Sequence, residues 1–423
     1  MNIAHVRVLA SLCVLAVMTV ACDRSDGAIR FSLVADAAEL AGYQELVNEF
    51  HATDPGFEVA LNPVASRGDL MAQLTTAFAG GSPPDVFLLN FRSYGQFAAD
   101  GALEPVQPML DDSEVLAESD LEPVSLDAFR YEGDELTCLP QNVSSLVVYY
   151  NVDLFEAHGL DAPRAGWTWD DFLATARELT DGETYGLGVE ASLIRLAPFV
   201  WSNGGELVDD EDSPTRLELD DPATRDAIEW FLDLSLRHEV VPPDAEEQAE
   251  SAEERFLRGG LGMLLESRQA VPTLRTIEGF EWDVAQLPVA PGGEPAGILH
   301  SDAYCIAADS EHQDEAWAFA EFAMSQEGQS ILSESGRLVP VREDVQTSES
   351  FLQPDAPPAN SQVFLDNIEH LRAVPHVAQW AEVEEVSESI LTDAFYGRVA
   401  RADALEQLDR EVARILRGGS DGG

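Results

Sequence analysis

Lysine is absent from this sequence of 423 residues: all 24 basic residues are arginine, against 78 aspartate and glutamate residues. The formal net charge at pH 7 is −54, and so strong a negative field repels nucleic acid and anionic lipid head groups. The composition therefore excludes a basic protein that binds nucleic acid. The acids are scattered along the chain, which is typical of a solvated surface suited to high salt. The alternative is a specific cation-binding face.

Cysteine is also scarce, with four residues: Cys13, Cys22, Cys138 and Cys305. Because there is no Cys-x-x-Cys pair and no cluster of cysteine and histidine, we predict neither a metal site nor a cofactor. Gly-x-Ser-x-Gly, His-Glu-x-x-His and phosphate-binding loops are absent as well. Pairs of carboxylates are no evidence for a catalytic site here, since 78 aspartate and glutamate residues produce such pairs by chance. We therefore predict no catalytic residues.

Long hydrophobic runs are limited to the N-terminus, where Val8–Ala21 is almost wholly apolar over 14 residues. A transmembrane helix needs about 20 residues, so this run suits the core of a signal peptide over residues 1–21. No later segment of the sequence is long and apolar enough to cross a membrane.

The apolar run ends in Thr19-Val20-Ala21-Cys22. Small residues before a cysteine resemble the lipobox of bacterial lipoproteins, which implies that Cys22 carries a lipid. Residues 22–27 then form a polar tether, and the lipid alone holds the protein on the extracytoplasmic face of the cell membrane. The alternative is ordinary signal cleavage near Ala21. At the other end, we expect residues 418–423 to form a disordered tail.

The mature chain begins with alternating strand and helix patterns. Short apolar runs predict strands at 29–35, 57–61 and 85–89, and apolar residues at helical spacing predict helices at 39–51 and 69–79. Strand–helix–strand units of this length are typical of a parallel, doubly wound sheet. The sequence therefore predicts an α/β fold.

Short motifs follow one another in a recognisable order. They are Gly80 to Val86, Phe97 to Pro105, Leu139-Pro140, Val147 to Phe155, Trp167 to Phe172, Trp201 to Glu206, Phe256 to Met263, Leu287 to Val289, Ala316 to Phe319 and Gly336 to Pro340. Together they resemble the extracellular solute-binding proteins of ABC importers, in the family whose members mostly bind sugars. The resemblance covers nearly all of residues 28–417. One motif also has a direct physical interpretation, since Thr168 with Asp171 forms a capping-box pattern at a helix start.

The resemblance implies the two-lobed fold of type II periplasmic binding proteins, in which each lobe is a doubly wound sheet flanked by helices. The ligand then lies in a cleft between the lobes. Lobe one is expected to comprise residues 28–138 plus 306–342, and lobe two residues 139–305 plus 343–417. In the last part, helical spacing predicts helices at 362–371, 381–396 and 403–416.

Candidate ligand contacts follow from this arrangement, because ligands of open α/β sheets bind beyond the carboxyl ends of strands. Sugars need aromatic faces to stack on and planar polar groups that hydrogen-bond paired hydroxyls. The aromatic candidates are Tyr94, Trp201 and Tyr304. The polar candidates are Glu39, Arg67, Arg92, Asn142, Asn203, Glu266, Arg268 and Asp302.

Each of these candidates has a structural alternative. Trp201 and Tyr94 are also suited to packing, and Arg268 to a surface ion pair with Glu266. Many family members carry Gly-Trp, with the tryptophan stacked on sugar, where this chain has Ser267-Arg268. That departure leaves room for a more polar or anionic ligand than the usual sugar.

The resemblance implies a lipid-anchored receptor that closes on a small polar solute, a carbohydrate by preference, and delivers it to the subunits of an ABC permease. We expect a monomer that is not an enzyme. The alternatives are a signalling or adhesion lipoprotein that reuses the fold and a secreted glycosidase that uses paired carboxylates.

The two cysteines that remain after processing, Cys138 and Cys305, are placed by the resemblance at crossings between the lobes. Such crossing strands run side by side, and the compartment is oxidising. We therefore expect a disulfide between Cys138 and Cys305. The alternative is two separate buried thiols.

Overall fold

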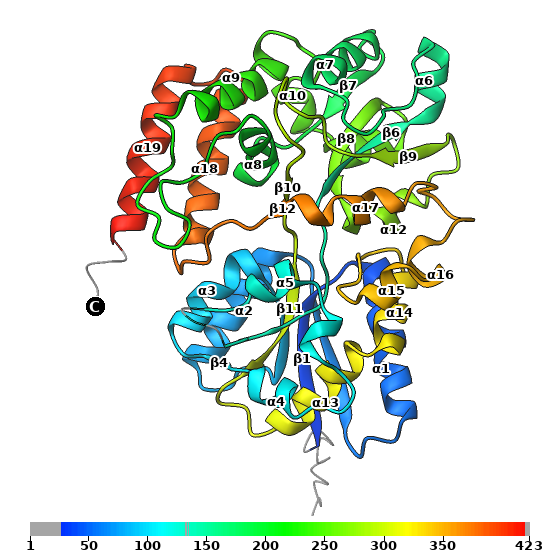
Figure 1. Cartoon of the computed structure of the whole chain (residues 1–423), viewed down its shortest axis with the longest axis vertical. Helices are drawn as coiled ribbons and strands as arrows, with labels where there is room; N and C mark the ends of the chain where they lie inside the picture. Colours follow the sequence, from blue (N-terminus) through cyan, green and yellow to red (C-terminus); the bar gives the residue numbers. More distant parts are fainter. Residues whose placement is uncertain (1–26, 132, 134, 419–423) are drawn as a thin grey trace, which may run out of the picture.

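The computed structural model describes residues 27–131, 133 and 135–418, which form two lobes stacked along the long axis of the molecule (Figure 1). The predicted signal peptide, the lipidation site at Cys22 and nearly all of the tether lie outside the described residues. So do residues 419–423, whereas Gly418 belongs to the last helix rather than to a tail. None of the helices in the described ranges is long and apolar enough to cross a bilayer.

Lobe one is built on a sheet with strand order β2-β1-β3-β11-β4, to which β5 is added beside β11. β1 is parallel to β2 and β3, as the sequence predicts, but β11 is antiparallel to β3 because it enters from the other lobe. The strands are β1 (Ala28–Val34), β2 (Glu58–Val64), β3 (Val86–Asn90), β4 (Leu103–Glu104), β5 (Leu139–Pro140) and β11 (Asp302–Ala307). The helices are α1 (Ala37–Ala52), α2 (Arg67–Ala79), α3 (Phe91–Ala99), α4 (Gln107–Asp111), α5 (Pro123–Asp127), α13 (Gln313–Ala323), α14 (Gln326–Glu334), α15 (Glu343–Gln346) and α16 (Glu349–Leu352).

Two helices of lobe one begin directly at the carboxyl edge of this sheet. Ser66 caps α2 by accepting a hydrogen bond from the backbone N–H of Asp69. Asn90, the last residue of the buried strand β3, caps α3 by accepting from the backbone N–H of Arg92. Such caps satisfy N–H groups that have no partner inside the helix. They fix the first turns of α2 and α3 beside each other.

Lobe two has a smaller, mixed sheet with strand order β7-β8-β6-β9. β7 and β8 are parallel, whereas β6 is antiparallel to both β8 and β9. The strands are β6 (Leu146–Asn151), β7 (Tyr185–Gly188), β8 (Leu261–Ser267) and β9 (Trp282–Ala285). The helices are α6 (Val152–His158), α7 (Trp169–Glu178), α8 (Leu193–Ser202), α9 (Pro222–Leu236), α10 (Asp244–Glu247), α11 (Ala252–Leu257), α12 (Val271–Leu274), α17 (Gln362–Asp366), α18 (Trp380–Phe395) and α19 (Arg401–Gly418).

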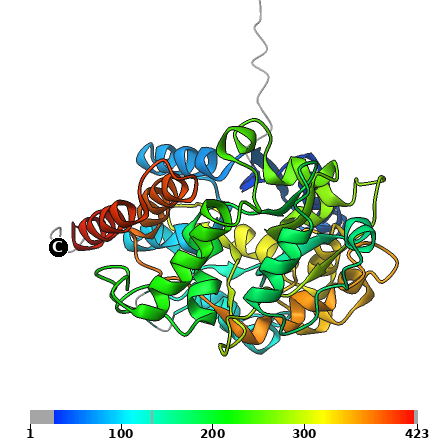
Figure 2. The ribbon, with the colours of Figure 1, turned by 90° about the horizontal axis from the view of Figure 1, so that it is seen from above.

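The predicted helices near the C-terminus occur with changed limits. α18 and α19 lie against each other at one side of the molecule (Figure 2). The helix expected over 362–371 stops at Asp366, and the chain then enters a 3₁₀ turn and the short strand β12 (Leu371–Arg372). The capping box at the start of α7 is confirmed, since Thr168 and Asp171 bond each other's backbone N–H groups.

The lobes are joined by segments that run side by side. β12 pairs with β10 (Gly297–Ile298), and isolated bridges join Ser144 to His300 and Asn142 to Pro340. Strand pairing also places residues 302–305 in the lobe-one sheet, whereas the sequence prediction put them in lobe two. Residues 343–352 likewise pack on α14, with Phe351 fully buried, because α15 and α16 extend lobe one.

The predicted disulfide between Cys138 and Cys305 is confirmed, with the Cα atoms 4.6 Å apart. Cys305 lies in β11, and Cys138 immediately precedes β5, which pairs with β11. Both side chains are fully buried. The bond therefore ties the outgoing segment to the returning strand at the base of the crossing.

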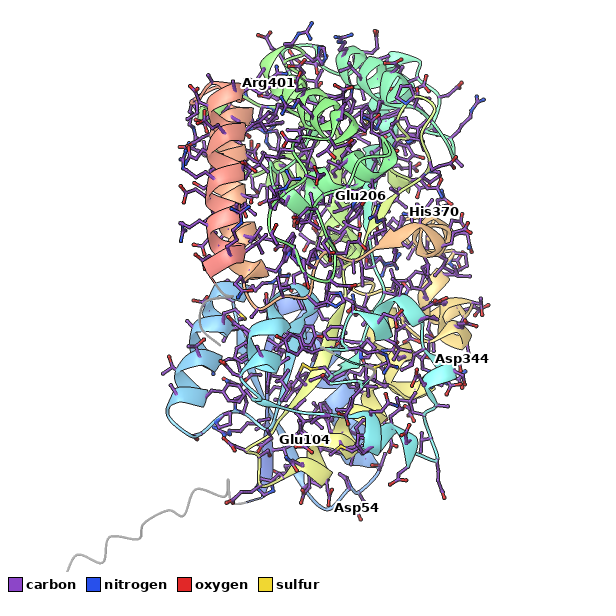
Figure 3. All side chains as sticks on the ribbon, turned by 60° about the vertical axis from the view of Figure 1, so that its left-hand side comes forward. Asp54, Glu104, Glu206, Asp344, His370 and Arg401 are labelled. Atoms are coloured by element: carbon purple, nitrogen blue, oxygen red, sulfur yellow. A yellow bond between two sulfur atoms is a disulfide. The ribbon has the colours of Figure 1, made fainter. Side chains whose placement is uncertain are left out.

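The acids are spread over the surface, as the sequence indicates. Figure 3 places Asp54, Glu104 and Asp344 in separate parts of lobe one, and Glu206 in lobe two. No group of three or more histidine, cysteine, aspartate or glutamate side chains among residues 27–131, 133 and 135–418 is arranged to hold a metal ion.

Candidate functional site: a polar cleft between the lobes

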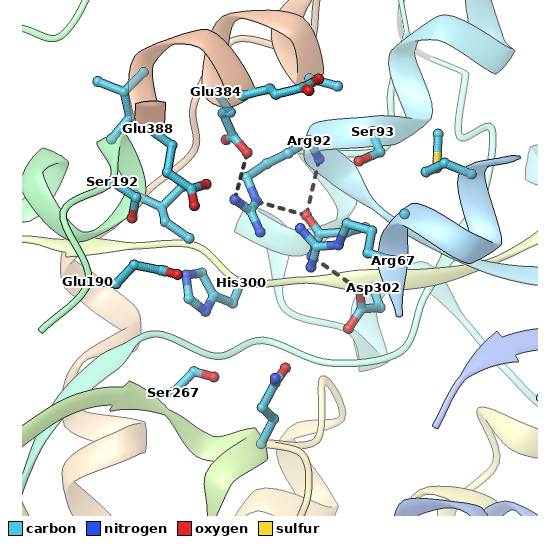
Figure 4. A pocket seen from close by; sticks show the side chains of 18 of the residues that line it. Arg67, Arg92, Ser93, Glu190, Ser192, Ser267, His300, Asp302, Glu384 and Glu388 are labelled. Atoms are coloured by element: carbon cyan, nitrogen blue, oxygen red, sulfur yellow. Dashed lines mark hydrogen bonds and ion pairs between the residues drawn. The ribbon is translucent and has the colours of Figure 1, made fainter. Parts of the chain in front are cut away.

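A cleft of about 970 Å³ separates the two lobes and is lined by both (Figure 4). Lobe one contributes the first turns of α2 and α3 and the start of β11. The opposite wall comes from the loop between β7 and α8, the end of β8 and one side of α18. The cleft therefore lies beyond the carboxyl ends of strands, where α/β folds place their ligands.

The lobe-one wall is a connected polar network. Asn90 Nδ2 donates to Asp302 Oδ1 at 3.1 Å, and Asn90 Oδ1 accepts from Arg92 Nε at 3.0 Å. Arg92 is 6% exposed, and its Nη1 lies 2.8 Å from a carboxylate oxygen of Glu384 on α18. This ion pair reaches from α3 in lobe one to a helix that packs mainly on lobe two.

Arg67, at the first position of α2, differs from Arg92. Its side chain touches solvent in the cleft and makes no hydrogen bond or ion pair to any described residue. Enclosure by the surrounding protein and the positive charge of Arg92 lower the pKa of Arg67 to about 10. Arg67 therefore presents a full set of unused donors to the cleft.

The lobe-two wall is rich in carboxylates. Arg195, 7% exposed in the first turn of α8, pairs with Glu266 at 2.6 Å and lies 4.0 Å from Glu190. On α18, Glu388 faces the cleft (Figure 4). Partial burial and the like charges of Glu190 and Glu384 raise the pKa of Glu388 above its ordinary value.

The crossing segments close the back of the cleft. Asn142 Oδ1 accepts from the backbone N–H of Asp302 at 2.8 Å, and Asn142 Nδ2 donates to the carbonyl of His300 at 3.2 Å. Burial, with the charges of Arg92, Arg195 and Arg67, holds the pKa of His300 well below its usual range. His300 is therefore a neutral group at pH 7.

The structure brings six of the sequence-predicted site residues together. Five line the cleft: Arg67, Arg92, Asn142, Glu266 and Asp302. The sixth, Glu39, lines an adjoining hollow of about 370 Å³, together with Arg67 and Asp302, and pairs with Arg337 at 2.7 Å.

The three aromatic candidates do not reach the cleft. Tyr94 is fully buried against Phe129, and Tyr304, in the inner strand β11, is fully buried against Phe31. Trp201 is 7% exposed and packs beneath the guanidinium of Arg372 at 4.8 Å. The expectation that they stack on a ligand is wrong for this structure, because each fills a hydrophobic core or packs under another side chain.

Two polar candidates also lie elsewhere. Asn203 ends α8, and its Nδ2 donates to the carbonyl of Ala223 at 2.8 Å. Arg268 is fully buried: its Nε donates to the carbonyl of Gly336, and Phe351 packs on its guanidinium at 4.7 Å. Burial lowers the pKa of Arg268 to about 9. Arg268 therefore holds the segment after α14 in place rather than contacting the cleft, and it forms no surface pair with Glu266.

The sequence reasoning missed several lining residues: Glu190, Ser192, Arg195, Arg337, Glu384, Glu385 and Glu388. Glu190 and Arg195 follow strand β7, so the rule that placed Arg92 after β3 also applies to them. The α18 residues carry no comparable signal, because they come from a helix that packs beside the cleft. Among the described residues that line the cleft, none is phenylalanine, tyrosine or tryptophan.

Comparison with known proteins supports this arrangement. Residues 35–330 match the family described as bacterial extracellular solute-binding proteins. A binding protein of Brucella abortus is 23% identical over 95% of this chain and 97% of its own length. The diacetylchitobiose binding protein DasA of Streptomyces coelicolor is 25% identical over 82% of this chain and 80% of its own.

Solved structures share the two-lobed fold. The ABC substrate-binding protein Lmo0181 of Listeria monocytogenes, in complex with cycloalternan, superposes with a TM-score of 0.85 at 23% identity, covering 92% of this chain and 98% of that protein. Maltose-bound MalE3 of T. maritima gives 0.79 at 23% identity, covering 91% and 98%. The family match spans more than half of the sequence. The chain therefore belongs to the bacterial extracellular solute-binding proteins.

Proposed function

We propose that this protein is the solute-capturing component of an ABC import system and that it binds a carbohydrate or related polar solute in the cleft. The observation that carries the proposal is a cleft of about 970 Å³ with hydrogen-bonding side chains on both walls. Such a volume is typical of sites for small molecules. Relatives named for diacetylchitobiose and maltotriose support a carbohydrate ligand.

Six residues are proposed to hold the ligand. Asp302 and Asn142 are the central pair, since their hydrogen bond joins the returning strand to the first crossing at the back of the cleft. A carboxylate and an amide side by side suit two neighbouring hydroxyl groups. The remaining four are Glu39, Arg67, Arg92 and Glu266.

Lobe closure is the proposed mechanism. A ligand that contacts both walls binds the closed form more strongly than the open form, so it shifts the equilibrium between them. The pair of Arg92 with Glu384 already joins the walls at one side, so closure changes the environment of these charges. The permease subunits are proposed to recognise the closed form.

We further propose that a lipid on Cys22 holds a monomer on the extracytoplasmic face of the membrane. The lipobox-like Thr19-Val20-Ala21-Cys22 and the polar residues that follow it support this part. The disulfide between Cys138 and Cys305 is compatible with an oxidising compartment. Binding is proposed to leave the solute chemically unchanged.

A thermal-shift screen of the mature protein tests the proposal. The panel contains neutral sugars, sugar acids, amino sugars, polyols, amino acids and divalent metals. A ligand present at one hundred times its Kd stabilises the folded state by about 2.7 kcal/mol, and we expect this effect from a carbohydrate or polyol, with the compound recovered intact by mass spectrometry.

The control compares Asp302→Asn, in the cleft, with Asp161→Asn, an exposed carboxylate that does not line the cleft. Only Asp302→Asn is expected to lose the ligand-induced shift. Stabilisation by amino acids or metals alone would remove the carbohydrate from the proposal, and conversion of the compound would show an enzyme.

A further inference from the structure

An unpaired arginine is unusual in a protein with this composition. Acids outnumber arginines by 78 to 24, so an arginine side chain readily finds a carboxylate. The other arginines of the cleft illustrate this: Arg92 pairs with Glu384, Arg195 with Glu266 and Arg337 with Glu39. Within the described part of the chain, Arg67 has no hydrogen-bonding or ion-pairing partner.

The position of Arg67 directs its donors to the cleft. It lines both the main cleft and the adjoining hollow, on the same wall as Ser93 and Asp302 (Figure 4). It begins the 13-residue helix α2, and the N-terminal end of a helix carries partial positive charge. The closely placed Arg92 adds a second positive charge to this wall, although Glu384 already pairs with it.

The opposite wall has the reverse character. Glu385 and Glu388 on α18 face the cleft without a hydrogen bond or ion pair to another described residue, and Glu190 has only the 4.0 Å contact with Arg195. A guanidinium only donates hydrogen bonds and an ionised carboxylate only accepts them. A ligand that satisfies both walls therefore needs hydrogen-bond acceptors on the side that faces lobe one and hydrogen-bond donors on the side that faces α18.

Further unused polar groups line the same cleft. Ser144 Oγ and Ser192 Oγ belong to side chains that are 5% and 4% exposed, and neither oxygen has a partner in the described chain. Nε of Arg195, a side chain 7% exposed, also lacks a partner. Buried polar groups are normally hydrogen-bonded, so these atoms mark a wall that is completed by something else.

We propose that the solute is an acidic sugar or polyol, whose carboxylate or phosphate is bound by Arg67 and whose hydroxyl groups donate to Glu190, Glu385 and Glu388. This inference rests on the proposed function and names its substrate class. An arginine fork matches the two oxygens of such an anion. None of the described residues that line this cleft is phenylalanine, tyrosine or tryptophan, so a neutral sugar would have neither ring stacking nor an anionic group for Arg67. A purely cationic solute would meet the carboxylates of α18 but would leave Arg67 without a partner.

Binding titrations with chemically matched pairs test the inference. The pairs are glucose with glucuronate, galactose with galacturonate, and glycerol with glycerol 3-phosphate; glucosamine serves as the cationic probe. Calorimetry on the full mature chain is run at 0.1 M and 1 M NaCl, because screening weakens a charge interaction at the higher salt. We expect the acidic member of at least one pair to bind ten times or more tighter than its neutral partner at 0.1 M. If the preferred acid is a uronate, the group bound by Arg67 is a carboxylate; if it is glycerol 3-phosphate, the group is a phosphate.

Two variants locate the effect. Arg67→Gln is expected to remove the tenfold preference, because the acidic member of a pair loses its charged partner and its affinity falls at least tenfold more than that of the neutral member. Arg164→Gln makes the same charge change at an exposed site that does not line the cleft, and it should keep the preference. Melting temperatures check that both variants are folded.

The outcomes separate this inference from the proposed function. If neutral sugars bind as well as their acids, or if Arg67→Gln keeps the preference, the inference is wrong and solute capture in the cleft stands. If glucosamine binds best, the acidic wall selects the ligand and the inference is also wrong. If no sugar, acid or polyol binds the wild-type protein, both fail.

Discussion

The cleft and the hydrophobic core of this protein use opposite kinds of side chain. Tyr94 and Tyr304, which a sugar site would use for stacking, are buried in the core, whereas the cleft is lined by Arg67, Arg92, Asp302 and several glutamates. The core therefore depends on packing and the cleft on hydrogen bonds and charge. Residue type alone did not distinguish the two regions, because an aromatic ring serves either purpose.

The largest expected effect is a loss of stability in the core. Replacing both Cys138 and Cys305 with alanine removes a cross-link between residues 167 positions apart. The chain-entropy account gives a loss of about 4–5 kcal/mol in the free energy of unfolding, as an upper figure. Urea unfolding of the variant and the wild type measures it.

Calorimetric binding titrations should give the cysteine variant a ligand affinity within threefold of the wild type, since neither cysteine lines the cleft. Equal urea midpoints for the oxidised wild type and the variant would contradict a stabilising role for the bond.

Trp201→Ala comes next. Trp201 is 7% exposed, and truncation of a buried tryptophan costs about 3–5 kcal/mol. Loss of the ring also frees Arg372, which packs over it and pairs with Glu206 and Glu211. A drop in the free energy of unfolding below 1 kcal/mol would show that the ring is not a packing residue.

The charged side of the comparison is tested by Glu384→Gln. The change leaves the buried Arg92 with Asn90 but without a counter-charge, and we expect a loss of about 2 kcal/mol in unfolding free energy. Glu385→Gln is the matched control, because the neighbouring Glu385 is exposed and unpaired within the described chain. Similar losses in both variants would argue against the cross-lobe pair.

The smallest effect concerns pH. The folded state holds His300 neutral, so its contribution to stability is fully present above the unfolded pKa of about 6.5 and is lost as the pH falls below it, because the unfolded chain then takes up a proton. Replacing His300 with glutamine should therefore make stability fall less steeply from pH 7 to pH 5, by less than about 1.4 kcal/mol for each pH unit. Identical slopes for the variant and the wild type would contradict this assignment.

Much of the fold follows from local patterns in the sequence. Local sequence is enough to predict the alternation of β1, α1, β2, α2 and β3, because each of these elements depends on residues close together in the chain. The same holds for the capping box of Thr168 with Asp171. The disulfide could also be predicted, because the family resemblance places Cys138 and Cys305 in neighbouring segments that cross between the lobes.

The site was only partly predictable. Polar residues directly after strands, such as Arg92 after β3, reach the cleft because the carboxyl ends of strands meet there. Arg268 follows β8 in the same way, yet it turns inward and is covered by Phe351. Glu384 and Glu388 reach the cleft through the packing of α18 on α3 and α8, which no local pattern reveals.

The central claim is that a polar cleft, rather than an aromatic surface, binds the solute. The most direct test titrates the best ligand of the screen into Asp302→Asn and Trp201→Ala side by side, with folding verified for both. The account predicts that Asp302→Asn loses more than tenfold in affinity, or about 1.4 kcal/mol, while Trp201→Ala stays within threefold. A tenfold loss in Trp201→Ala together with unchanged binding by Asp302→Asn would contradict it.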